Sequence, residues 1–166
     1  MKRSIAFRIT PAMVLSTCAA AVTILIAAQS APSASWNGIE PLKSTRADVI
    51  RILGQPIGES TEGVLRFSVM GGSVQVIFVS DKFLTAKKLR PELAGTVLEI
   101  VLQHEHSNET AESMNLLKNK SFARDETKTT TIFRNIKEGI IYTFIDDKLK
   151  STRYTFADSQ LSRARR

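Results

Sequence analysis

The sequence predicts an α+β fold, in which short helices pack on an antiparallel β-meander within one small domain. One observation is a segment, residues 44–56, that carries the capping and stop residues of a short helix. A second is the alternation of apolar and polar residues beyond residue 64, which is typical of strands with one buried face. Because such strands leave one sheet face apolar, the helices are expected to cover that face.

The first predicted element is a helix of about two turns. Thr45 can accept a hydrogen bond from the amide of Asp48, whose carboxylate can return one in a capping box. Val49 and Leu53 then lie on one face and are expected to pack against the sheet. Gly54 can adopt the backbone conformation that ends a helix. The complete structural motif comprises Thr45, Asp48, Val49, Leu53, Gly54 and Pro56.

The next predicted elements are strands. Residues 65–69 and 74–78 alternate in hydrophobicity around Gly71-Gly72, which predicts a β-hairpin. A polar, lysine-rich segment at 80–95 is expected to be a long loop, and long ordered loops often carry function. Residues 97–102 form the next predicted strand.

The second half of the chain predicts the same order of elements. A helix is expected to begin at Ser107 or Asn108 and to end at Asn119, with its apolar stripe formed by Ala111, Met114 and Leu117. Strands are expected around 130–134, at 140–145 and from about 150 to 156, with a turn at 146–148.

The spacing of the apolar residues points to an internal repeat. Four of them in the first half have counterparts at a constant offset in the second: Phe67, Val74, Val76 and Phe78 match Phe133, Ile140, Tyr142 and Phe144. The pattern leaves two alternatives open, because any two hairpins with similar turns share some matches. Residues 36–158 are either one undivided domain or two half-repeats, 36–103 and 104–158.

Residues 1–35 are predicted to be a signal peptide or an N-terminal membrane anchor. The first eight residues carry three basic side chains, and residues 9–28 carry no charge. Small residues then favour cleavage between about 30 and 35. The uncharged stretch is also just long enough to span a bilayer, so an uncleaved anchor is the alternative. Cys18 is the only cysteine, so the cleaved protein has no disulfide and no cysteine metal ligand.

The net charge of +7 is concentrated at the two ends of the chain. Three basic residues lie in the leader, and Arg163, Arg165 and Arg166 lie at the C-terminus, so the body between them is nearly neutral. A nearly neutral body argues against nucleic acid as a partner, because phosphate binding needs a basic face. Residues 159–166 are predicted to be a frayed basic tail, with electrostatic contact to an anionic membrane or polymer as the alternative.

The first helix resembles a known family. Thr45, Asp48, Val49, Leu53, Gly54 and Pro56 stand at the spacing of the helix signature of the SmpA/OmlA group of outer-membrane assembly lipoproteins, whose fold β-lactamase-inhibitor proteins share. The segment 36–46 is similar to the opening of a group of uncharacterised exported bacterial proteins. The resemblance implies a helix packed on a three- or four-stranded meander, and a scaffold that binds other proteins without catalytic residues. The chain departs from the lipoproteins because Cys18 lacks the usual lipidation context.

One cluster has the character of a metal site. His104 and His106 flank Glu105, and two histidines at i and i+2 of a strand point to the same side; Glu109 or Glu112 could add a carboxylate. The alternative is a strand that has ended and turns through polar residues. Trp36 is expected to anchor the core, with an exposed recognition aromatic as the alternative.

The leader predicts an exported protein of the periplasm or the extracellular space, and the resemblance, with the absence of a catalytic motif, implies a non-enzymatic bacterial protein. It is expected to bind another envelope or secreted protein through its sheet, an edge strand or the lysine-rich loop, without a cofactor. Membrane contact is expected only through residues 1–35, if they are retained. The alternative function is that of a metal-binding periplasmic protein that uses His104 and His106.

Overall fold

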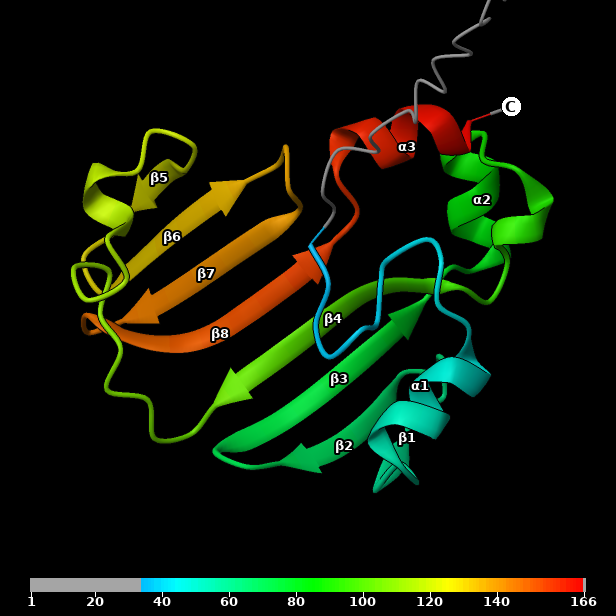
Figure 1. Cartoon of the computed structure of the whole chain (residues 1–166), viewed down its shortest axis with the longest axis horizontal. Helices are drawn as coiled ribbons and strands as arrows, with labels where there is room; N and C mark the ends of the chain where they lie inside the picture. Colours follow the sequence, from blue (N-terminus) through cyan, green and yellow to red (C-terminus); the bar gives the residue numbers. More distant parts are fainter. Residues whose placement is uncertain (1–33, 166) are drawn as a thin grey trace, which may run out of the picture.

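A computed structural model describes residues 34–165 of the chain. The predicted leader therefore lies almost wholly outside the described residues, as do its cleavage region up to residue 33, Cys18 and Arg166. Over these described residues the fold is α+β, as the sequence predicts: three short α-helices accompany one antiparallel sheet (Figure 1).

The sheet has eight strands in the order β1-β2-β3-β4-β8-β7-β6-β5, and every neighbouring pair is antiparallel. Two four-stranded halves thus meet where β4 pairs with β8. Their bounds are β1 (Gly58–Glu59), β2 (Leu65–Val69), β3 (Gly72–Phe78), β4 (Val97–His104), β5 (Ala123–Glu126), β6 (Thr130–Asn135), β7 (Ile140–Ile145) and β8 (Lys148–Thr155). The predicted strands are confirmed, and the two short edge strands β1 and β5 are additional.

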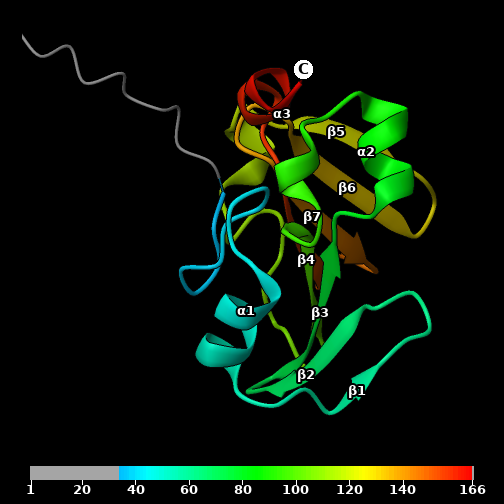
Figure 2. The ribbon, with the colours of Figure 1, turned by 90° about the vertical axis from the view of Figure 1, so that its right-hand side faces the viewer.

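The helices are α1 (Arg46–Leu53), α2 (Asp81–Lys87) and α3 (Asp158–Ala164), with short 3-10 turns η1 (Pro91–Leu93) and η2 (Leu116–Lys118). Helix α1 lies against one face of the β1–β4 half. Helices α2 and α3 lie together at one end of the sheet (Figure 2). The faces of the sheet are therefore covered unequally.

Helix α1 forms as its capping residues predict. The Asp48 amide donates to the Thr45 hydroxyl (3.3 Å), and the Thr45 amide donates to the Asp48 carboxylate (2.9 Å). The Gly54 amide then closes the last turn on Ile50 at a φ of +82°. Val49 is fully buried, whereas Leu53 is only half-buried, so Val49 is the residue that fastens the helix to the sheet.

The capping box makes stability depend on pH. The hydrogen bond from the Thr45 backbone, then the bonds from Arg51 and the Thr45 hydroxyl, lower the pKa of Asp48 from 3.8 to about 2. A carboxyl group with a lowered folded-state pKa stabilises the fold above its unfolded pKa, and the contribution fades as pH falls. Urea unfolding should therefore show Asp48→Asn less stable than wild type at pH 6, with the gap closing between pH 4 and 2. A gap independent of pH would contradict this.

The interior is divided into three apolar clusters. The first, which we call the α1 cluster, lies between α1 and strands β2–β4 and contains Ile39, Val49, Leu65, Phe67, Val74, Val76, Val97 and Ile100. The second lies at the end of the sheet and contains Val79, Leu84, Leu89, Leu93 and Ala164. The third, which we call the far cluster, contains Leu116, Phe133, Phe144 and Leu149. The α1 cluster and the far cluster hold the two halves of the sheet, and each is centred on its own half.

The helix predicted between residues 107 and 119 was wrong. The segment folds as consecutive turns ending in η2, and its turn is capped by Thr110 and Ser113, not by Ser107 or Asn108. Asn115 has a φ of +53°, a left-handed conformation that interrupts a right-handed helix. As a result Leu116 is buried while Leu117, from the predicted stripe, is 53% exposed.

Two segments predicted to be irregular are ordered by packing. The loop expected at 80–95 contains α2 and η1, and the tail expected at 159–166 is largely α3, so the domain continues past residue 158. Leu84, Leu89 and Leu93 bury against Ala164 of α3. Each segment is too short and too polar to be stable alone, and the shared burial explains why both fold.

The two halves of the sheet do not repeat with a constant offset. Phe67 pairs with Val74 in the first half, but Phe133 pairs with Tyr142 in the second. If Phe67 and Phe133 are equivalent, the constant offset would place Ile140 opposite Phe133. Tyr142 lies there instead, two residues further along β7. The reason is the connection, since β2 and β3 are joined by two residues and β6 and β7 by four.

Candidate functional site

The most distinctive surface lies where the two halves of the sheet meet. Antiparallel pairing places Leu102 of β4 opposite Thr152 of β8, and Thr152 opposite Tyr142 of β7. Two residues further along β8, and on the same face, Tyr154 lies opposite Ile140 of β7. Tyr142, Tyr154 and Leu102 are only half-buried, because α1 covers one half of this face and the turns at 107–122 cover the other. An apolar strip therefore remains between the two covers.

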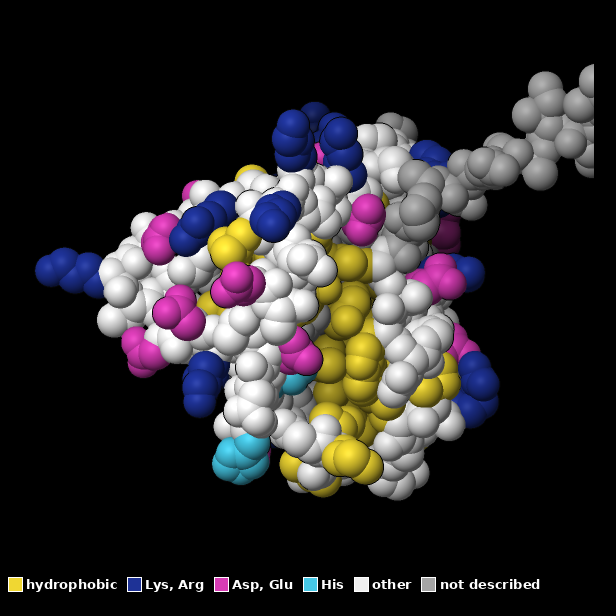
Figure 3. All heavy atoms as spheres, turned by 60° about the vertical axis from the view of Figure 1, so that its left-hand side comes forward, with side chains coloured by type: hydrophobic (Ala, Val, Ile, Leu, Met, Phe, Trp, Pro, Cys, Tyr) yellow, Lys and Arg dark blue, Asp and Glu magenta, His cyan; other side chains and the backbone are white. Residues whose placement is uncertain are grey.

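The strip borders, at Leu102, a groove that we call the junction groove. It is lined by Trp36, Asn37, Val69, Met70, Gly71, Gly72, Leu102, Gln103 and His104, and its volume is about 290 Å³. Figure 3 shows hydrophobic side chains gathered in a hollow between two mostly polar lobes. Met70 is fully exposed at the turn between β2 and β3. The groove is thus an apolar recess with a flexible thioether at its rim.

Trp36 lies partly in the core and partly at the surface. It is half-buried, it packs against the α1 cluster, and it also lines the junction groove. Its amide donates to the carbonyl of Ile39 (3.1 Å), and the Ile39 amide donates back to the carbonyl of Trp36 (2.9 Å). This small bridge holds the indole against the end of the sheet.

The residues that line the groove include no Asp, Glu, Lys or Arg. Burial lowers the pKa of His104 below its usual 6.5. Burial also raises the pKa of Tyr142 and Tyr154, with smaller contributions from Glu138 to the first and from Tyr142 to the second. An uncharged imidazole and two uncharged phenols make the strip suited to apolar and hydrogen-bonding groups.

The two histidines predicted to bind a metal are not equivalent. Strand β4 ends at His104, whose Nε2 lies 2.9 Å from the hydroxyl oxygen of Thr152, while His106 is exposed in the following bend. Within residues 34–165 no group of three or more His, Cys, Asp or Glu side chains is placed to hold a metal ion. Thr152 is only 3% exposed, so its hydroxyl is shielded from solvent.

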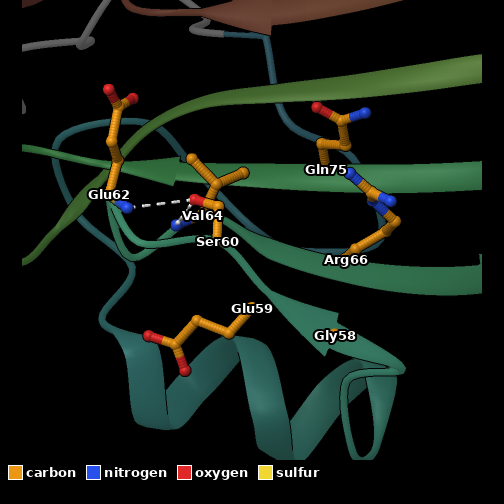
Figure 4. A pocket seen from close by; sticks show the side chains of 7 residues that line it. All are labelled: Gly58, Glu59, Ser60, Glu62, Val64, Arg66 and Gln75. Atoms are coloured by element: carbon orange, nitrogen blue, oxygen red, sulfur yellow. Dashed lines mark hydrogen bonds between the residues drawn. The ribbon is translucent and has the colours of Figure 1, made fainter.

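The other candidate surfaces are less distinctive. A cleft of about 350 Å³ beside β1 and β2 is lined by Gly58, Glu59, Ser60, Glu62, Val64, Arg66 and Gln75 (Figure 4). The Ser60 hydroxyl accepts hydrogen bonds from the amides of Glu62 and Val64, both at 3.2 Å, so the loop at its mouth is closed on itself. Its edge strand β1 has two residues, and the opposite edge strand β5 is Ala-Arg-Asp-Glu. Short and charged edges oppose pairing with another strand.

The opposite face of the sheet is mixed, with arginine side chains beside apolar ones such as Val101 and Ile141. Arg66, Arg153 and Arg134 lie in one row across β2, β8 and β6. Arg153 pairs with Glu99 at 2.7 Å, and Arg134 pairs with Asp125. Burial raises the pKa of Glu99 and Arg153 opposes that rise. Most of the charge on this face is therefore engaged within the sheet.

Sequence reasoning found two residues of the junction groove, Trp36 and His104, and missed Met70 and Leu102. Met70 could have been recognised as an apolar residue placed in a turn, next to Gly71, where polar residues are usual. Leu102 follows the ordinary alternation of a strand, so the sequence holds no signal that its side chain is incompletely covered.

No helix within residues 34–165 is both long and apolar enough to cross a membrane. The likeness of residues 45–56 to the SmpA/OmlA signature stays a prediction. The chain matches no protein-family model, and comparison with curated proteins and with solved structures finds no match for it.

Proposed function

We propose that the protein is an exported, non-enzymatic binding module of the bacterial envelope, and that its junction groove receives an apolar side chain of another envelope or secreted protein. One observation carries this proposal: Met70 is fully exposed in the lining of the groove, beside Leu102 and Trp36, which are half-buried. Apolar residues that gather in a recess, instead of being scattered, are typical of interaction sites.

The dimensions of the groove favour part of a protein over a small molecule. A volume of about 290 Å³ lies at the lower limit for sites that enclose a whole ligand. It is enough for one or two side chains, and the groove is open to solvent at the end of the sheet. The flexible side chain of Met70 can adjust to partners of different shape.

Site-specific photocrosslinking in intact cells tests this proposal. A benzoylphenylalanine in place of Met70 should form a product larger than the 18.3 kDa chain, with the partner joined through an apolar side chain. The same group at Ile57, which is 66% exposed and does not line the groove, is the control and should give little of that product.

A charge at the groove provides a second measurement. Met70→Asp places a charge in an apolar contact and should weaken binding by about 1.4 kcal/mol. Recovery of the same partner should therefore fall by about tenfold. Ile57→Asp should leave recovery unchanged. Equal crosslinking from positions 57 and 70, or recovery of the protein alone, would refute binding at the groove.

Export predicts a defined N-terminus. If residues 1–35 act as a signal peptide, mass spectrometry of the protein from cells should show a loss of roughly 3.5 kDa, the mass of thirty-odd residues. Two contacts favour a site upstream of the folded domain: the Ala34 amide donates to the carbonyl of Glu138 (2.8 Å), and Trp36 lines the groove. Cleavage is therefore expected before Ala34. A full-length chain in the membrane fraction would instead establish the anchor.

A further inference from the structure

Five basic side chains gather at the end of the sheet where α2 and α3 lie. They are Lys87 and Lys88 at the C-terminal end of α2, Arg90 just beyond it, and Arg163 and Arg165 at the end of α3. We call this group the basic end. The two contributing segments are about 75 residues apart in the chain, so the grouping is a result of folding.

The backbone holds the two segments of the basic end together. The Arg90 amide donates to the carbonyl of Ala164 (3.0 Å), and Leu89 forms an antiparallel bridge with Arg165. Leu89 and Ala164 are buried in the same apolar cluster. The basic side chains therefore project from a packed base.

The charge of the basic end is poorly compensated. Arg90 pairs with Glu92 at 3.5 Å, and both side chains are about half exposed. Within the described residues, the other four basic side chains have no acidic partner. All 16 acidic residues of the chain lie within residues 34–165. They offset the Lys and Arg residues outside the basic end, so the remainder of the domain is close to neutral. The domain is electrically polarised toward this end.

The chain enters the described structure at the same end. The Ala34 amide binds the carbonyl of Glu138, and the neighbouring Ile136 carbonyl accepts the amide of Asp158 at the start of α3. Figure 1 shows the described chain beginning near the end of β8, from which the chain continues into α3. Only residues 29–33 separate this point from the uncharged stretch 9–28. Five residues reach at most about 18 Å, so a bilayer that holds this stretch would lie near Ala34 and the start of α3.

We propose that the basic end binds the anionic headgroups of a phospholipid bilayer. Basic side chains near an anionic membrane surface are attracted to it over roughly a Debye length. In the uncleaved chain the tether makes a membrane a better partner than nucleic acid or an acidic protein, because an apolar stretch that meets a bilayer brings this end to the surface first. A cleaved protein would retain the same end and bind the surface reversibly. The junction groove would stay accessible, since it opens at the other end of β4.

Lysine footprinting on vesicles tests the proposal with the full chain. The protein is mixed with vesicles of phosphatidylcholine, or of phosphatidylcholine and phosphatidylglycerol at 3:1, acetylated briefly and mapped by mass spectrometry. On the anionic vesicles Lys87 and Lys88 should react at least threefold more slowly than on the neutral ones. Exposed Lys118 and Lys148 are the internal controls and should react equally on both. Salt at 0.5 M should remove the protection.

Three outcomes would overturn the proposal. One is equal reactivity of Lys87 and Lys88 on both kinds of vesicle, and another is equal protection of Lys118 and Lys148. The third is equally strong protection of Lys87 and Lys88 by a DNA duplex, which would assign the basic end to polyanions in general. The footprinting measures protection of Lys87 and Lys88, whereas the crosslinking measures partner binding at Met70. A failure of lipid binding is therefore distinguishable from a failure of partner binding at the junction groove.

Discussion

Gly139→Ala is expected to destabilise the protein by roughly 3 to 5 kcal/mol. Gly139 lies in the connection between β6 and β7 at a φ of +78°, where a residue with a Cβ atom is strained. An added Cβ would also lie 3.0 Å from the carbonyl carbon of Thr155 and closer still to its oxygen. That oxygen belongs to backbone at the end of β8, so it has little room to move.

Two other glycines separate the strain from the collision. Gly71 has a φ of +84° but open space around it, so Gly71→Ala should cost about 1 to 2 kcal/mol. Gly58 has neither feature, and Gly58→Ala should change stability by less than about 0.5 kcal/mol. Chemical denaturation of the three variants measures the order. If Gly139→Ala were no worse than Gly71→Ala, the close packing of the β6–β7 connection on β8 would be wrong.

Phe67→Ala should cost about 3 to 5 kcal/mol, through lost burial and the cavity left behind. Phe67 is 1% exposed at the centre of the α1 cluster, opposite Val74. A domain of this size has only about 5 to 15 kcal/mol in total, so thermal unfolding should shift by many degrees. The result bears on the groove as well, because the same cluster supports Trp36 and Leu102.

Met70→Ala is the matched control for Phe67→Ala. Both residues belong to the β2–β3 hairpin, but Met70 is fully exposed, and its truncation should change stability by less than about 0.5 kcal/mol. A large loss of stability from Met70→Ala would mean that its side chain is buried, and the junction groove could not then be a free surface.

The sequence predicted the elements whose signals are local. Helix α1 depends on hydrogen bonds between Thr45 and Asp48 and on the stop at Gly54, all within ten residues. The strands β2, β3 and β7 depend on alternation and on short turns. Such signals are readable because the groups that interact are close in the chain.

The sequence misled where long-range packing decides the local structure. Helices α2 and α3 are polar over most of their length, and both are stabilised by burial of Leu84 and Ala164 in one cluster. The turns at 107–122 show the opposite error, since the sequence predicted a helix there. Asn115 takes a left-handed conformation that lets Leu116 enter the far cluster. Intrinsic propensity is a weak guide when tertiary burial opposes it.

The residues by themselves determined the fold class, the position of α1 and the predicted export leader, since composition, capping and alternation are properties of short stretches. Only the tertiary structure decided the candidate site. The junction groove lies where Trp36 and the β2–β3 turn meet the end of β4, and the pairing of β4 with β8 brings His104 against Thr152, 48 residues away. The basic end likewise requires residues 87–90 to meet 163–165. Such contacts depend on register and on which surfaces stay uncovered, and no local pattern encodes either.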